Sequence, residues 1–196
     1  QGDFHAHAAV LAELGSAPRA VRTAAGLEGL AGLVMPGGES TAMLRLMATD
    51  DLGARIRERV RGGMAVLATC AGVILLAETV TPSQPSLGLL AVEVVRNAYG
   101  RQPQSTVTTV ELAPALGAPA RLEGVFIRAP RITGTGAGVE VLGRRGEDPV
   151  LVRQGRILGA TFHPELAGDR RIHELFVRMG EDGQARVAAG ASRLGA

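Results

Sequence analysis

Short apolar runs alternate with helical patterns along the first half of the chain. Residues 30–35 and 64–68 are apolar runs of strand length. The segments 51–61 and 71–80 have the composition and spacing of helices, the second of them mostly buried. Strands that are buried on both faces have nearly continuous apolar sequences, and helices connect them when they run parallel. The pattern therefore predicts an α/β fold with a largely parallel sheet covered on both faces.

The second half of the chain has a different pattern. Several short strands rich in Val and Thr are predicted within residues 91–112 and 125–158. A closing helix is predicted over 169–179, and a Gly-rich loop over 133–138. Its glycines are too irregularly spaced for a phosphate-binding fingerprint, so we assign this loop no cofactor. We expect one domain over residues 1–180, followed by a mobile tail over residues 181–196 that is rich in Ala and Gly.

Composition and charge narrow the possible functions. The 196 residues are 46% hydrophobic and 20% charged, which suits one domain with a sizeable core. All 21 basic residues are Arg, and the net charge is only +2. No basic stripe is interleaved with aromatic residues, which make up 3% of the chain, so we expect no nucleic-acid partner.

The single cysteine excludes an internal disulfide, and no Cys/His cluster has zinc-ligand spacing. We therefore expect neither a metal nor a cofactor. The absence of a disulfide fits a reducing compartment, so the sequence predicts a cytoplasmic protein. No segment has the length of a membrane span, and no signal peptide is recognisable.

Cys70 lies between the apolar run 64–68 and the helical segment that follows it. This is the setting of a nucleophile elbow, in which a sharp turn between a strand and a helix exposes a nucleophile. The small residues Ala68, Ala71 and Gly72 fit such a crowded turn. The positive end of the helix would favour the thiolate, and the Ala71 N–H would stabilise an oxyanion. The alternative is that Cys70 is simply a small buried hydrophobic residue.

His163 and Glu165 supply a candidate base and its partner. They are two residues apart at the end of an apolar strand, and alternate residues of an extended chain face the same side. Pro164 favours extended geometry at His163. Glu165 would then fix the tautomer of His163, leaving the other ring nitrogen for the nucleophile. Taken alone, His163 could simply be a turn residue. The combination of the His163–Glu165 pair with the elbow at Cys70 predicts a catalytic triad. We predict that His5, His7 and His173 are surface residues and assign them no role.

The sequence at these positions resembles class I, or triad, glutamine amidotransferases. Thr69-Cys70-Ala71-Gly72 and His163-Pro164-Glu165 are their two characteristic motifs. Further segments resemble the glutaminase subunits of pyridoxal 5′-phosphate synthase, the PdxT/SNO family, over residues 1 to about 179. They are PGGEST (36–41), LGLL (87–90), RN (96–97), GRQ (100–102) and GVFIRAP (124–130).

The resemblance implies a three-layer sandwich with a mixed, largely parallel central sheet and a nucleophile elbow. It implies hydrolysis of L-glutamine to L-glutamate and ammonia through a thioester on the cysteine. The ammonia would pass to a (β/α)₈-barrel synthase subunit of the PdxS family, which uses it to build pyridoxal 5′-phosphate. The resemblance also implies that such a glutaminase has little activity until it docks to that partner.

The resemblance also implies which residues surround the substrate. The Gly37-Gly38 turn would complete the oxyanion hole with Ala71. The glutamine site would be lined by Gly38, Glu39, Ser40, Arg96, Ile127 and Arg128. Arg96 and Arg128 are then candidates for the substrate carboxylate, and Glu39 for its ammonium group. Alternatively, Ser40 only caps a helix over 41–47, and the two arginines are surface or partner contacts.

The sequence departs from the family at two places. Ala68 stands where the family usually has Gly, and we expect a modest effect at most. Family chains also carry an apolar strand ahead of a Leu-Gln-Gly turn, whereas this sequence starts at Gln1-Gly2. We expect a gap in the sheet at the position of that strand.

Two other functions remain open. The chain could be a glutaminase that serves another synthase, or a subunit that binds the synthase without catalysis.

Overall fold

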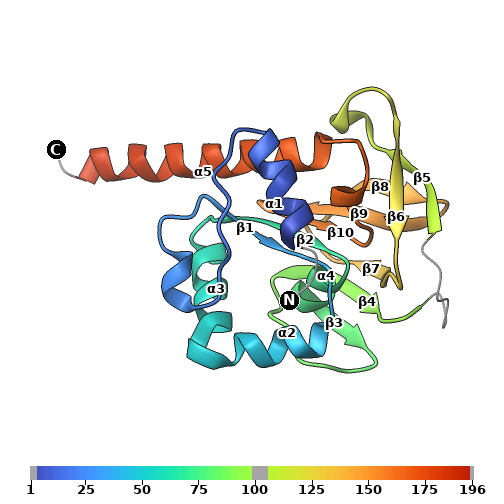
Figure 1. Ribbon diagram of the computed structural model, residues 1–196, viewed down its shortest axis with the longest axis horizontal. Coiled ribbons are helices and arrows are strands. Elements are labelled where there is room, and N and C mark those ends of the chain that lie inside the picture. The colour runs from blue at the N-terminus through green and yellow to red at the C-terminus, as the bar shows by residue number, and fades with distance from the viewer. Residues whose placement is uncertain (1–3, 99–105, 195–196) are drawn as a thin grey trace.

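The computed structural model describes residues 4–98 and 106–194 and consists of two sheets surrounded by helices (Figure 1). The helices are α1 (Phe4–Glu13), α2 (Ser40–Met47), α3 (Leu52–Arg61), α4 (Ala71–Leu76) and α5 (Arg171–Leu194). The strands are β1 (Gly32–Met35), β2 (Ala65–Thr69), β3 (Ala77–Thr81), β4 (Leu90–Val95), β5 (Thr106–Leu112), β6 (Arg121–Phe126), β7 (Arg131–Thr135), β8 (Glu140–Arg145), β9 (Asp148–Gln154) and β10 (Ile157–Ala160).

The main sheet is mixed, as the family resemblance implied, but its parallel part is smaller than expected, because two of its six strand pairs are parallel and four are antiparallel. Its seven strands have the order β1-β2-β10-β9-β8-β5-β6. β1, β2 and β10 are parallel, whereas β9, β8, β5 and β6 continue the sheet with antiparallel pairs. A second sheet of three strands has the order β3-β4-β7. The carboxyl ends of the parallel strands β2 and β10 lie side by side, which brings the segments that follow them to one edge of the sheet.

Strand β2 separates two hydrophobic cores because its side chains alternate between the faces of the sheet. Ala65 and Leu67 pack in the core that contains the buried side chains of α5 and Leu11 of α1. Val66 and Ala68 pack on the opposite face with α2 and α4. The sheet therefore lies between α1 and α5 on one side and α2 and α4 on the other, the expected three-layer arrangement (Figure 1).

Three predicted elements have different boundaries in the structure. The helix predicted over 71–80 ends at Leu76, where β3 begins, because Thr79, Val80 and Thr81 favour extended structure. The loop predicted over 133–138 is partly the strand β7, which pairs with β4. The closing helix α5 continues beyond Met179 to Leu194. The mobility of the tail remains a prediction.

The strands of the main sheet are paired without interruption. The gap that we expected is not present between any two of these seven strands, and β1 forms one edge. Helix α1 lies ahead of β1 in the described part of the chain. No helix was predicted from the sequence at this position. The Gln1-Gly2 pair and the GRQ segment at 100–102 lie outside the described residues.

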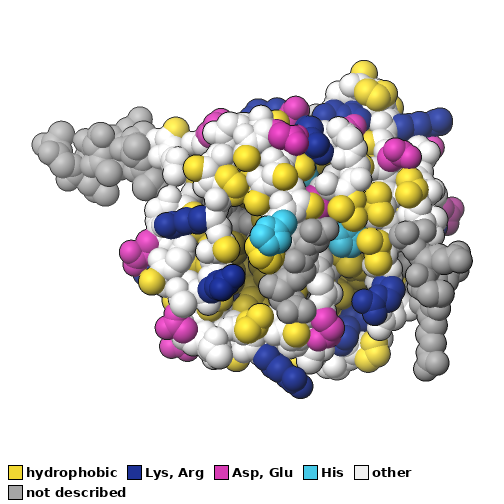
Figure 2. All heavy atoms as spheres, viewed as in Figure 1, with side chains coloured by type: hydrophobic (Ala, Val, Ile, Leu, Met, Phe, Trp, Pro, Cys, Tyr) yellow, Lys and Arg dark blue, Asp and Glu magenta, His cyan; other side chains and the backbone are white. Residues whose placement is uncertain are grey.

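The surface carries charges of both signs. Arg and acidic side chains are interspersed over the face seen in Figure 2 rather than gathered into one stripe. No helix in the described part of the chain has both the length and the apolar composition needed to cross a membrane.

The first turn of α4 packs unusually closely on β1. A Cβ atom at Gly72 would lie 2.1 Å from the carbonyl oxygen of Met35, far inside van der Waals contact. This glycine therefore sets the distance between the helix that follows Cys70 and the strand that precedes the Gly37-Gly38 turn.

We expect Gly72→Ala to lower the free energy of unfolding by about 1–3 kcal/mol, the range typical of overpacking in a core. The added methyl group meets backbone atoms, which cannot move aside as a flexible side chain could. Urea denaturation measures the effect. Gly168→Ala is the matched control, because Gly168 is exposed and a Cβ there has no atom within 4 Å. Equal stability of both variants would contradict this account of the packing.

Candidate active site

Cys70 occupies a strained turn between β2 and α4. Its φ of 47° and ψ of −106° are sparsely populated for a residue with a side chain, and such strain often marks a functional site. The Cys70 N–H donates to the carbonyl oxygen of Ala160, at a distance of 2.8 Å, so the end of β10 holds the turn in place. The side chain is buried and lies at the start of α4. The structure thus forms the predicted elbow, with the Ala71 N–H in the first turn of a helix.

His163 and Glu165 are paired, as predicted. The Nδ1 atom of His163 lies 2.7 Å from Oε1 of Glu165, and both residues are buried. The local backbone differs from the expectation of an extended chain. β10 ends at Ala160, and Glu165 lies in the 3₁₀ turn η4 (Pro164–Leu166). The turn, rather than strand alternation, therefore brings the carboxylate to Nδ1 of the ring.

The protonation of His163 depends on its two partners. Burial lowers the pKa of His163, but hydrogen bonds to Cys70 and Glu165 and the negative charges of both outweigh burial and raise its pKa to about 10. His163 is therefore an imidazolium at neutral pH. A proton on this ring beside a thiolate is the resting state that a cysteine nucleophile requires.

Gly37 lies against both members of the Cys–His pair. A Cβ atom at Gly37 would be 2.4 Å from Cε1 of His163 and 3.3 Å from Cβ of Cys70. The Gly37 N–H donates to Oγ1 of Thr69, at 3.1 Å, and is therefore already engaged. The exposed Gly38 follows it in the turn.

Other predicted site residues lie around the cysteine. The carbonyl oxygen of Ile127 is 3.8 Å from Sγ of Cys70, which places this residue at the nucleophile. Arg128 is exposed, with a φ of 45°, another strained value for a residue with a side chain. Arg96 is half-buried, and its charge helps to lower the pKa of Glu39, so these two residues are near each other.

Glu39, not Ser40, caps α2. The Glu39 carboxylate accepts hydrogen bonds from the N–H groups of Thr41, at 3.0 Å, and Ala42, at 2.7 Å. These bonds, Thr41 first, lower its pKa. The Ser40 hydroxyl instead donates to Oε1 of Gln84, at 3.1 Å. The capping role suggested for Ser40 is therefore wrong, because Glu39 already fills the cap position.

His7 and His173 are not surface residues. Both are buried, and Nδ1 of His7 lies 3.0 Å from Nε2 of His173. The sequence contained a signal that could have found them. His7 is three and four residues before the buried Val10 and Leu11, and His173 is three before Phe176, so each lies on the apolar stripe of its helix. His5, on the same helix as His7, is exposed as predicted.

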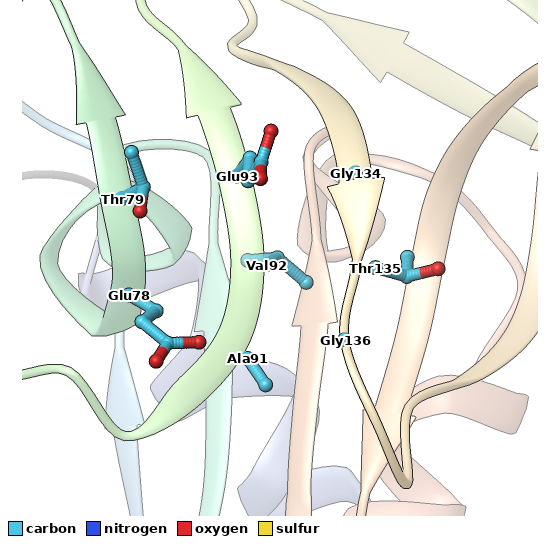
Figure 3. Close-up of a pocket in the computed structure, with 8 residues that line it drawn as sticks. All are labelled: Glu78, Thr79, Ala91, Val92, Glu93, Gly134, Thr135 and Gly136. Atoms are coloured by element: carbon cyan, nitrogen blue, oxygen red, sulfur yellow. The ribbon is translucent and has the colours of Figure 1, made fainter.

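A separate hollow of about 280 Å³ lies over the three-stranded sheet (Figure 3). Its walls come from β3, β4 and β7, and the carboxylates of Glu78 and Glu93 belong to its lining. None of the predicted site residues lines it.

Comparison with known proteins agrees with this geometry. A model of the SNO glutamine amidotransferase family matches residues 1–182. The chain belongs to this family. It is similar to proteins named pyridoxal 5′-phosphate synthase subunit PdxT. It is 47% identical to that of Thermotoga maritima over 180 residues, which is 91% of this chain and 95% of the relative. The relative from Solibacter usitatus is 49% identical over 181 residues, which is 90% of this chain and 94% of the relative.

Solved structures support the same family and fold. The chain is similar to a crystal structure of a glutamine amidotransferase, with a TM-score of 0.85 and 44% identity over 92% of this chain and 95% of that one. A structure from Thermoplasma acidophilum, at 19% identity and a TM-score of 0.68, covers 95% of this chain and 94% of that one, and shares the fold.

We expect His163 to titrate far above His7 and His173. His163 should keep both ring protons up to about pH 9, because its pKa is about 10. His7 should stay neutral down to about pH 4, because burial, then the charges of His173 and His163, lower its pKa to about 3. His173 should gain a proton only near its pKa of about 4, which burial and then Arg170 lower. A ¹⁵N titration of the histidine rings measures all three, and the spectrum of His163→Gln assigns the first. Titration of His163 near pH 6.5 would contradict an imidazolium ring held by Cys70 and Glu165 at neutral pH.

We expect Gly37→Ala to lower the rate of glutamine hydrolysis sharply while the protein stays folded. The added methyl group would collide with the His163 ring, which must move away from Cys70. A loss of about 10²-fold or more in turnover is expected for a triad whose geometry is broken. Steady-state rates and a thermal melt measure the two effects. Activity within twofold of the parent would contradict this account, because it would mean that the His163 ring accommodates the added methyl group without leaving its position.

Proposed function

We propose that this chain is the glutaminase subunit of a pyridoxal 5′-phosphate synthase, acting through a triad of Cys70, His163 and Glu165. The observation that supports it best is the buried His163–Glu165 pair, which meets a cysteine on a strained elbow in a chain of the glutamine amidotransferase family. The relatives named above carry the same subunit name.

In the first half-reaction, the Cys70 thiolate attacks the side-chain amide carbon of glutamine. The negative charge moves to the amide oxygen, where N–H groups of Ala71 and Gly38 stabilise it. Imidazolium His163 then donates its proton to the amide nitrogen, the C–N bond breaks, and ammonia leaves. A thioester between Cys70 and the glutamyl group remains, and His163 is now neutral.

In the second half-reaction, water replaces ammonia. Neutral His163 takes a proton from the water as it attacks the thioester carbon, and the same two N–H groups hold the new oxyanion. The C–S bond breaks, glutamate leaves, and the thiolate–imidazolium pair is restored. Glu165 keeps the proton on Nδ1 of His163 throughout, so Nε2 is the nitrogen that exchanges protons.

The far end of the substrate carries a carboxylate and an ammonium group, and both need partners. We assign the carboxylate to Arg96 and Arg128 and the ammonium group to Glu39. Glu39 already accepts two backbone N–H groups, which use part of its acceptor capacity and leave room for a further donor. Ile127, beside the sulfur, and Ser40, in the same turn as Glu39, complete the lining.

Ammonia needs a protected route, because in water at neutral pH most of it becomes ammonium, which is not a nucleophile. We therefore propose that the chain docks to a (β/α)₈-barrel synthase subunit of the PdxS type and releases ammonia into it. We also propose a cytoplasmic location, since a thiolate nucleophile is protected from oxidation in a reducing compartment.

We expect glutamate release from glutamine to rise when the synthase subunit is added, and to vanish in Cys70→Ala. The variant lacks the attacking sulfur, and only a small fraction of the catalysis would remain. A coupled assay for glutamate, with and without the synthase subunit, measures the effect.

The outcomes separate the three candidate functions. Binding of Cys70→Ala to the synthase, measured by sedimentation, shows that the loss of activity is chemical. Binding without glutamate release by the parent chain would leave a non-catalytic subunit as the function. Glutamate release that only a different synthase stimulates would identify a glutaminase that serves another pathway.

A further inference from the structure

His7 makes contact with the catalytic triad from helix α1. Its Nε2 atom lies 3.2 Å from Oε2 of Glu165, the oxygen that His163 does not use. The same nitrogen lies 3.1 Å from Oγ1 of Thr69, the residue before the nucleophile. The side chains of His7 and Glu165 are buried, at 2% and 0% exposure, so water does not provide a ready substitute for these contacts.

The charges around His7 determine which ring nitrogen carries its proton. A lone pair on Nε2 would face the carboxylate at 3.2 Å, which is repulsive, so the hydrogen belongs on Nε2. Nδ1 of His7 must then accept a hydrogen bond from Nε2 of His173, at 3.0 Å. Nδ1 of His173 has no partner among the described residues, and as an unprotonated nitrogen it leaves no buried donor unsatisfied.

Thr69 connects this histidine to the oxyanion turn. Its Oγ1 atom has two lone pairs, one of which accepts the N–H of Gly37, at 3.1 Å. The N–H of His7 donates to the second lone pair, and Oε2 of Glu165, which has no hydrogen-bond partner among the described residues, lies 3.2 Å from the same nitrogen. Thr69 reaches both because it continues the β2 face of Ala65 and Leu67, which points toward α1 and α5.

We propose that His7 is a positioning residue that holds Glu165 and, through Thr69, the Gly37 turn in their catalytic geometry, with His173 fixing its tautomer. This inference rests on the proposed glutaminase function. A neutral histidine suits this position because it brings an N–H within 3.2 Å of the carboxylate without adding a positive charge, which would compete with the charge on His163. Helices α1 and α5, remote in sequence from the nucleophile, thus support the reaction that occurs on β2.

His7→Gln and His7→Asn separate the effect of an N–H at the position of Nε2 from simple filling of the space. Glutamine can place an N–H near the position of Nε2, whereas asparagine reaches only the position of Nδ1, next to His173. We expect His7→Asn to lower kcat by about 10- to 100-fold, a part of the 10²–10⁴ that general acid–base catalysis contributes, with KM within about twofold. We expect His7→Gln to restore most of kcat. The rates are measured with the synthase subunit present.

Alkylation of Cys70 by iodoacetamide provides a second readout that needs neither substrate nor partner. Cys70 is the only cysteine, so the mass change reports on it alone. We expect slower alkylation in His7→Asn than in His7→Gln, because a misplaced Glu165 weakens the thiolate–imidazolium pair. His5→Asn is the matched control, since His5 is an exposed histidine on the same helix, and we expect it to leave both readouts unchanged.

Equal kcat and equal alkylation in the two His7 variants would overturn the proposal, as would a ¹⁵N spectrum of the parent in which Nε2 of His7 lacks a proton. If neither His7 variant folds, Thr69→Val and Thr69→Ser test the same link. Only the serine variant keeps the hydroxyl, and equal activities would overturn the proposal. Absence of glutamate release by the parent chain would contradict the glutaminase function instead, while the alkylation comparison would still decide the role of His7.

Discussion

The buried carboxylate of Glu165 is the group on which the arrangement of the site depends. Its side chain is fully buried, and a buried carboxylate is costly unless donors surround it. His163 donates to one oxygen and His7 lies at the other, so helix α1 and the turn η4 meet at this group. The hydrogen bond to Oε1 thus fixes the orientation of the His163 ring, and the approach of His7 to Oε2, which has no hydrogen bond of its own, brings the N-terminal helix to the same carboxylate.

Close packing is the second constraint, and it acts through residues without side chains. Gly72 allows α4 to approach β1, and Gly37 allows the oxyanion turn to approach the Cys70–His163 pair. Both contacts are closer than any Cβ atom permits. Together they place two backbone segments around one sulfur atom, and this proximity is what stabilisation of an oxyanion requires. The strained φ of Cys70 is maintained by the same packing and by its hydrogen bond to Ala160.

Much of the site was predictable because its signals are local in the sequence. The elbow is a contiguous pattern of a strand, a cysteine and small residues, and the His163–Glu165 pair is separated by only one residue. Element boundaries were less predictable. The helix predicted over 71–80 ends four residues earlier, at Leu76, because pairing of β3 with β4 overrides a sequence that is apolar enough for either structure.

The sequence by itself determined the fold class and the family, and it predicted a nucleophile and its base, since each depends on residues that are adjacent or nearly so. Only the tertiary structure decided the roles of His7, His173 and Thr69. His7 and His173 are 166 residues apart, and no local pattern indicates that two helices will bring their rings within 3.0 Å. A histidine also takes its function from the groups that it contacts, because burial and neighbouring charges determine whether it is neutral or charged. Those groups come together only when the two outer helices pack on the same face of the sheet.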